Sequence, residues 1–270
     1  MADNTPSART DDVERFFTSL KSMNELDTLE IRNVVRGLLS PTQRDICFTG
    51  NYFRATANVE TLLSLKNAKD FQAIAMLARS LFELAVEIRL INEVDNAVEK
   101  IIVFSDVEKL RSAQKIVSFK RRDPGAKVDA AIYAEFVAKN EQRINQERVA
   151  TWPEVKKVAH WSLMNMAERA EKLGAPFEEI YQVNYPQLSL YVHSGIVGIV
   201  NISKETFALL AGIAFTIALE SYMQIIEAVI NEFKIYKADG KLKDKMQFAK
   251  MLPFTDGPQQ ADLLRQAFSL

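Results

Sequence analysis

A mostly apolar stretch over residues 68–94 constrains the fold of this chain more than any other feature. Most positions after Asp70 are apolar, so we expect a helix that other helices enclose. Among the charged residues within it, Arg79, Glu83 and Glu87 have i, i+4, i+8 spacing, which places them on one stripe. A charge inside a core is strongly destabilising unless it is paired and hydrogen-bonded. The stripe therefore either faces solvent or forms a polar site.

The remainder of the chain predicts an all-α fold. No alternating strand pattern occurs, and the 9 glycines and 8 prolines fall mainly at the ends of helical patterns. We expect a multi-helix bundle of about eight or nine helices. Among the expected helices are 11–22, 27–39, 42–66, 97–122, 126–150, 176–183 and 186–200.

Capping signals predict two further helix boundaries. Thr151, followed by Pro153 and an acidic residue, is typical of an N-cap and first turn. Gly174 suits the C-cap of the same segment, so we expect one helix over 151–173. Ser203 is expected to cap a long apolar helix that runs to about residue 236.

Length and charge indicate an ordinary soluble protein. The formal net charge of −1 argues against a strong general attraction to nucleic acid, although a local basic patch stays open. We expect a disordered segment over 1–10, a single helical domain over 11–240, and a tail over 241–270 with short helices. The one cysteine, Cys47, has no intrachain disulfide partner, which fits a cytoplasmic location. The uncharged run between Glu205 and Glu220 is shorter than the roughly 18–20 residues that span a bilayer, so we expect no membrane partner.

The histidine count limits the chemistry. Only His160 and His193 are present, so one chain cannot build a three-histidine metal site. The motifs of di-iron bundles, phosphate-binding loops, dinucleotide folds and nucleophile elbows are all missing. We therefore expect no metal and no cofactor.

His193 is the stronger candidate for a chemical role. It follows Ser189 by four residues on a predicted helix, so both side chains share a face, and Tyr181 and Tyr185 precede them at the same spacing. A histidine there suits a general base or a group that orients a phosphate. The alternative is a core histidine bonded to a carboxylate of the 79–87 stripe.

Two other features have both a structural and a functional interpretation. His160 is expected on a helix surface or a half-buried edge, without a chemical role. The basic residues 120–122 complement the dipole at the end of the 97–122 helix. Their functional interpretation is phosphate contact, with Lys115 and Lys127 nearby.

Three stretches carry a family resemblance. The first is the Arg-Ser-x-x-Glu pattern at residues 79–83. The second is Trp152, followed by residues 166–168 and Gly174. The third is the Tyr-x3-Tyr-x3-Ser-x3-His pattern over 181–193. In this order the chain resembles, over roughly residues 45–230, a widespread bacterial all-helical family of unknown function. The resemblance implies a helical fold and candidate residues rather than a reaction.

That family is loosely similar to the HEPN superfamily of helical RNases and nucleotide-binding proteins, many of which act in toxin–antitoxin and phage-defence systems. The superfamily's usual arginine a few residues before a histidine is missing here, where Pro186, Gln187 and Leu188 precede His193. Arg79 would then supply the arginine from another helix. Under this resemblance the catalytic residues are His193, Arg79 and Glu83, and the binding residues are Tyr185, Ser189, Glu87 and Tyr181.

Several functions stay open at this point, and so does the question of whether the protein is an enzyme. The first is a HEPN-like RNase or nucleotide-binding module with RNA or a nucleotide as partner. The second is a non-catalytic interaction protein or homo-oligomeric scaffold, in which Arg79 and Glu83 form a buried ion pair and the surfaces 126–150 and 241–270 meet partners. In that case loss of Arg79 is expected to destabilise the fold by about 3–5 kcal/mol. The third is a small-molecule pocket lined by tyrosines at 181, 185 and 191.

Overall fold

Helices make up every regular element in the described part of the chain. The structure is a computed structural model that describes residues 7–65, 70–192, 204–235, 242 and 244–247. No strand occurs among these residues, and the expected all-α bundle of eight or nine helices is confirmed for them. The elements are α1 (Ser7–Leu26), η1 (Asp27–Ile31), α2 (Arg32–Arg36), α3 (Gln43–Leu62), α4 (Phe71–Leu90), α5 (Ala97–Arg122), α6 (Ala131–Thr151), α7 (Met166–Leu173), α8 (Phe177–Glu179), η3 (Ile180–Asn184), α9 (Tyr185–Val192) and α10 (Lys204–Glu232), where η denotes a π-helical turn.

Contacts between the helices group the chain into two compact units. The first unit comprises Met1–Leu90 and Arg169–Leu270, and the second comprises Ile91–Glu168. The first unit is therefore built from two segments that the second separates in sequence. The single domain expected over 11–240 stays a prediction.

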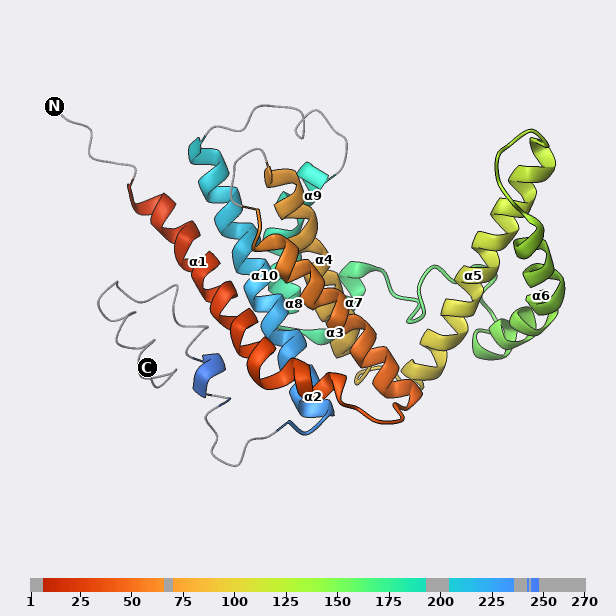
Figure 1. Ribbon diagram of the computed structural model, residues 1–270, viewed down its shortest axis with the longest axis horizontal. Helices are drawn as coiled ribbons and strands as arrows, with labels where there is room; N and C mark the ends of the chain where they lie inside the picture. Colours follow the sequence, from red (N-terminus) through yellow and green to blue (C-terminus); the bar gives the residue numbers. More distant parts are fainter. Residues whose placement is uncertain (1–6, 66–69, 193–203, 236–241, 243, 248–270) are drawn as a thin grey trace. The chain divides into compact units, whose positions relative to one another are not determined.

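The central helix of the first unit is α4. Eleven of its twenty residues are buried. It packs against α3, α9 and α10, and α10 packs in turn against α1 and α3 (Figure 1). These contacts confirm that other helices enclose the apolar stretch, because nearly all of its large apolar side chains face them.

The other long apolar helix, α10, is also a core helix. The segment Leu209–Glu232 is long and apolar enough to span a membrane. About two thirds of its most apolar part, 67%, is however buried within the protein. Such burial is typical of a core helix. Its last residue, Glu232, accepts two hydrogen bonds from Arg44 at the start of α3, at 2.6 and 2.8 Å. This bidentate pair fixes the register between α3 and α10.

The second unit is built around the antiparallel pair of α5 and α6, which lie side by side in Figure 1. Helix α5 has the expected bounds, and α6 begins a few residues later than expected. Buried Val107, Leu110 and Ile144 form a small core, and half-buried apolar residues pack on it. Polar contacts also join the two helices, including Gln114 to Glu141 at 2.7 Å.

The helix expected over 151–173 is wrong in its first half. Thr151 is the last residue of α6, and its hydroxyl donates to the Glu147 carbonyl at 2.8 Å instead of capping a new helix. Residues 152–165 form turns, and α7 begins only at Met166. The true cap is Asn165, which exchanges hydrogen bonds with Glu168 at 3.1 and 2.7 Å. Gly174 does end the helix, with a φ of +67°.

Other helix bounds differ in detail. The π-helical turn η1 replaces the start of the helix expected over 27–39, which ends at Arg36. Helix α1 begins at Ser7, inside the stretch expected to be disordered. Helix α9 covers 185–192, and the remainder of the helix expected to residue 200 lies outside the described residues, as does most of the tail.

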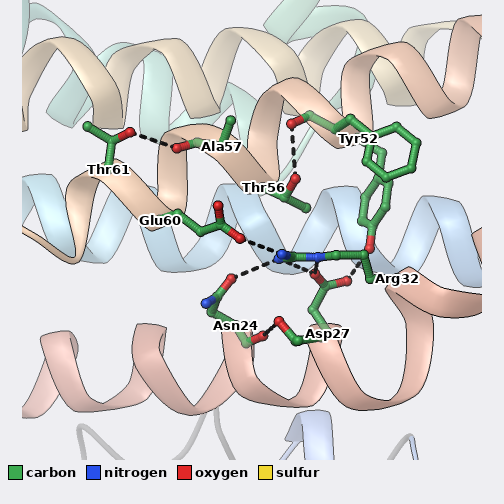
Figure 2. A network of polar contacts seen from close by, with 10 residues as sticks. Asn24, Asp27, Arg32, Tyr52, Thr56, Ala57, Glu60 and Thr61 are labelled. Atoms are coloured by element: carbon green, nitrogen blue, oxygen red, sulfur yellow. Dashed lines mark hydrogen bonds and ion pairs between the residues drawn. The ribbon is translucent and has the colours of Figure 1, made fainter. Parts of the chain in front are cut away.

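A buried polar network ties η1 and α2 to α3 (Figure 2). Asp27 is fully buried, and Arg32 donates to its Oδ2 from Nε at 3.1 Å and from Nη2 at 2.9 Å. The Tyr52 hydroxyl donates to Oδ1 of the same carboxylate. Arg32 also donates to Asn24 at 3.2 Å and to Glu60, whose side chain is 53% exposed. The network therefore runs from a sealed carboxylate to the surface.

Electrostatics in this network favour a charged Arg32 and protonated phenols. Burial opposes the charge of Arg32, but its hydrogen bonds to Glu60 and Asp27 raise its pKa overall. Burial, and then the Asp27 carboxylate, raise the pKa of the Tyr52 phenol and that of Tyr222 in α10. Both phenols are therefore protonated at neutral pH, which lets Tyr52 donate to Asp27.

Removing the guanidinium from this network is expected to destabilise the protein strongly. Arg32→Met keeps the aliphatic stem but leaves the Asp27 carboxylate buried without its cation, so we expect a loss of about 3–5 kcal/mol in the free energy of unfolding. Tyr52→Phe removes one donor and is expected to lose about 1–3 kcal/mol. Urea unfolding followed by circular dichroism measures both.

The matched control for these variants is Lys21→Met in α1. Lys21 lies 3.9 Å from Glu25 with 62% of its side chain exposed. We expect its unfolding free energy to stay within about 0.5 kcal/mol of the wild type. An equal loss in Arg32→Met and Lys21→Met would contradict a special role for the buried network.

Candidate functional site

The charged stripe of α4 lies at the boundary between core and solvent. The side chains of Arg79, Glu83 and Glu87 are 22%, 39% and 21% exposed. The stripe is thus neither a sealed ion-pair cluster nor a solvated face. Each of the three side chains is reachable from one side and held in place by the protein on the other.

Tyr185 at the start of α9 closes a three-membered cluster with Arg79 and Glu83. Arg79 Nε donates to Glu83 Oε1 at 3.0 Å and to the Tyr185 hydroxyl at 2.8 Å. The same hydroxyl donates to Glu83 Oε1 at 2.7 Å. The Arg79 guanidinium carbon also lies 4.9 Å from the Tyr185 ring centroid, a cation–π contact. The structure thus brings together three residues that the sequence predicted for one site.

Aromatic packing holds Tyr185 in position. Its ring lies 5.4 Å from that of Phe82 in α4 and stacks at 5.2 Å on Tyr181, which belongs to η3. The π-helical turn and the first turn of α9 thus present two tyrosines on one side. Tyr191 packs edge-on against Phe71 at 5.1 Å. These contacts place the tyrosines in aromatic packing, with only the Tyr185 hydroxyl in the polar cluster.

Electrostatics in the cluster favour a protonated Tyr185 phenol and a charged Arg79 guanidinium. Burial, and then the hydrogen bond and charge of Glu83, raise the pKa of Tyr185 to about 12. Burial opposes the charge of Arg79, but Tyr185 and Glu83 raise its pKa overall. At neutral pH Tyr185 is therefore a hydrogen-bond donor to a carboxylate, and Arg79 remains a cation that can face an anion.

The next residue on the stripe, Glu87, has an arginine of its own. Arg169 in α7 donates to it, and the Arg169 side chain is only 12% exposed. Sequence reasoning missed Arg169, although the resemblance pointed to the three residues just before it. It also missed Asn58 of α3, whose side chain donates to Ser80 at 2.9 Å. Glu87 lies one turn after Glu83 on the same helix, so it needs a cation other than Arg79. That need was the feature of the sequence that could have pointed to Arg169.

The remaining predicted site residues are only partly described. Ser189 lies half-buried on α9, one turn after Tyr185. His193, the predicted catalytic acid or base, lies outside the described residues. Across the described residues, no group of three or more His, Cys, Asp or Glu side chains is placed to hold a metal ion.

His160 has a structural environment. Its Nδ1 accepts the backbone N–H of Ser162 at 3.1 Å and lies 2.7 Å from the Ser162 hydroxyl. Its ring packs against Phe104 and Trp161, with centroids 6.0 and 5.3 Å away. These contacts shape the turn before α7, which supports the structural interpretation of this histidine.

Comparison with known proteins gives a family and no activity. A family model described as a family of unknown function (DUF5677) matches residues 46–206, more than half of the chain. The matched range contains α4, α9 and every residue of the cluster. No curated protein and no solved structure matched the chain.

Removing the Tyr185 hydroxyl tests the electrostatics of the cluster. Tyr185→Phe keeps the ring packing but takes one donor from Glu83, so we expect a loss of about 1 kcal/mol in unfolding free energy at neutral pH. Because the folded pKa of Tyr185 is raised to about 12, the hydroxyl's contribution is complete below the phenol's ordinary pKa and falls as pH rises toward 12. Wild type and variant should therefore converge in stability over this range, as measured by urea unfolding at several pH values.

The control is Tyr181→Phe, which leaves the Tyr185 hydroxyl and both of its hydrogen bonds in place. Its stability difference from the wild type is expected to change less with pH than that of Tyr185→Phe. If the Tyr185→Phe difference stayed constant through the alkaline range, the proposed donor role of the phenol would be wrong.

Proposed function

The chain belongs to the DUF5677 family, whose function is unknown, and we propose that it acts on RNA or a nucleotide as a HEPN-like module. The proposed site is the cluster of Arg79, Glu83 and Tyr185, with His193 as its acid or base. The proposed setting is the bacterial cytoplasm, in a defence or toxin-type system. The family match includes these residues but gives them no role, and the proposal assigns them one.

The single observation that carries the proposal is a partly exposed ion pair of Arg79 and Glu83 in the middle of the core helix α4, joined to the buried Tyr185 hydroxyl of α9. Partly exposed ion pairs contribute only about 0–1 kcal/mol to stability, so stability alone is a weak reason to place one here. The cluster is also preorganised, because Arg79 has its Nε fixed by Glu83 and Tyr185. A guanidinium held in one orientation is suited to bind a phosphate.

In the proposed reaction Arg79 holds the scissile phosphate of an RNA strand. His193 takes the proton of the neighbouring ribose 2′-hydroxyl, and the resulting oxygen attacks phosphorus. The bond to the 5′-oxygen breaks, that oxygen takes a proton from water as it leaves, and His193 returns its own proton to solvent. The products are a 2′,3′-cyclic phosphate and a 5′-hydroxyl end. Glu83 and Tyr185 act as positioning residues, because they orient the guanidinium.

Cleavage of a labelled single-stranded RNA by the full chain tests this function. His193→Ala is expected to lower the rate at least about 100-fold, the lower range for general acid–base catalysis. Arg79→Ala is expected to lower it as well and to weaken substrate binding. Mass spectrometry of the products should show the cyclic phosphate.

The matched control is Arg143→Ala, which removes an exposed arginine whose partner Glu147 is one helical turn away in α6. Its rate should equal that of the wild type. If His193→Ala folds and cleaves normally, the catalytic assignment fails. A different outcome is that neither the wild type nor any variant cleaves RNA, while calorimetry shows that nucleoside phosphates bind and that binding requires Arg79. The module is then a nucleotide binder.

A specific observation also favours a second candidate, a non-catalytic scaffold. Each stripe carboxylate is neutralised by its own arginine, Glu83 by Arg79 and Glu87 by Arg169. The two pairs tie α4 to α9 and α7 through hydrogen bonds. Because the Arg79 and Glu83 side chains are 22% and 39% exposed and not buried as expected, Arg79→Ala should lose only about 1 kcal/mol in the free energy of unfolding. A concentration-dependent molar mass from light scattering, without any RNA binding, would favour this alternative.

A further inference from the structure

The loop end of the α5–α6 pair combines cationic and exposed apolar side chains. We define this hairpin tip as residues 115–135, which include the last turns of α5, the connecting loop and the first turn of α6. The tip carries five cationic and three anionic side chains, a net charge of +2 in a chain whose net charge is −1. Phe119, Ile132 and Tyr133 of the tip are 44%, 70% and 39% exposed.

The acidic side chains of the tip are engaged locally. Asp123 and Asp129 each accept a backbone N–H of the loop or of the α6 start, at 3.1 and 3.0 Å. Glu135 pairs with Lys139 on the same helix at 2.5 Å. Lys120 donates to two loop carbonyls at 2.8 and 2.6 Å and so ties the loop to the end of α5. The exposed cations Lys115, Arg121, Arg122 and Lys127 therefore dominate the charge that the tip presents.

Complementing the helix dipole explains only part of this composition. Cations in the last turn of α5, among them Lys120, Arg121 and Arg122, complement the dipole at its C-terminus. Lys127 lies beyond the helix end, where the dipole effect no longer acts. The dipole also gives no reason for three large apolar side chains to be exposed beside the cations.

We propose that the hairpin tip binds single-stranded RNA. Proteins that bind single strands combine cations that follow the phosphates with exposed aromatic rings on which bases stack. The tip has this combination, with Phe119 and Tyr133 as the stacking rings and Arg121 and Arg122 among the phosphate contacts. The inference rests on the proposed function and deepens it, since it names an RNA strand and not a free nucleotide as the substrate class.

Fluorescence anisotropy with a labelled, unstructured RNA of about 16 nucleotides, the upper range of a single-strand site, tests the proposal. All proteins are full-length and carry His193→Ala, so that the RNA stays intact. The charge variant is Arg121→Glu with Arg122→Glu, and the ring variant is Phe119→Ser with Tyr133→Ser. Lys120 is left unchanged because its contacts hold the loop.

The charge variant is expected to bind at least about tenfold more weakly, and its salt slope should fall by roughly 1.4, since each phosphate contact on a single strand contributes about 0.7. The ring variant is expected to bind at least about fivefold more weakly, as loss of base stacking predicts. The control reverses two exposed lysines of the same unit, Lys156→Glu with Lys157→Glu, and should keep wild-type affinity. Circular dichroism checks that each variant is folded.

The outcomes separate this inference from the proposed function. Tip-dependent RNA binding without any cleavage would support RNA binding by the tip and contradict the proposed RNase activity. Cleavage that depends on Arg79 and His193, with RNA affinity unchanged in both tip variants, would contradict RNA binding by the tip alone. Equal losses of RNA affinity in the tip and control variants would show that the effect comes from general charge, and would also contradict RNA binding by the tip. Tip-dependent binding to phosphatidylserine vesicles with no affinity for RNA would replace RNA by a membrane surface.

Discussion

The first unit depends on one buried carboxylate, that of Asp27. A carboxylate without any contact with water needs hydrogen-bond donors on several sides. The charge of Asp27 is compensated by Arg32 and by the Tyr52 hydroxyl, which come from two different helices. Because an uncompensated buried charge is far more destabilising than a lost apolar contact, the positions of η1, α2 and α3 are coupled through this one side chain. The apolar packing of α4 and α10 then builds on helices whose register is already fixed.

The same chemical arrangement occurs twice in the first unit. Tyr52, Asp27 and Arg32 repeat the roles of Tyr185, Glu83 and Arg79: in each set a phenol donates to a carboxylate that is paired with a guanidinium. A π-helical turn adjoins each set, and such turns are common where a helix must reorient a side chain. Burial separates the two. The first carboxylate is sealed and serves the fold, while the second is 39% exposed and can meet a ligand.

Much of the fold could be predicted from the sequence, because helical periodicity and enclosure depend on local residue order. Arg79 and Glu83 could be placed together from their i, i+4 spacing, and Tyr185 was assigned to the same site through the family resemblance. The prediction that Thr151 caps a helix was wrong, because a threonine near the end of one helix can hydrogen-bond to a carbonyl of that helix as readily as it caps the next. The Asp27 network could not be foreseen, because its members are separated in sequence and a lone buried aspartate has no periodic signature. Arg169 was missed for the same reason.

The pairing of Arg44 with Glu232 has a consequence for how the protein is made. The two residues are 188 positions apart, so at about 5–20 residues per second their contact becomes available only on the order of 10–40 s after Arg44 is synthesised. During that interval the second unit, which is the continuous segment Ile91–Glu168, can complete its fold on the ribosome. The apolar faces of α3 and α4 must wait for α10 to emerge, so the nascent chain presents them to chaperones in the meantime.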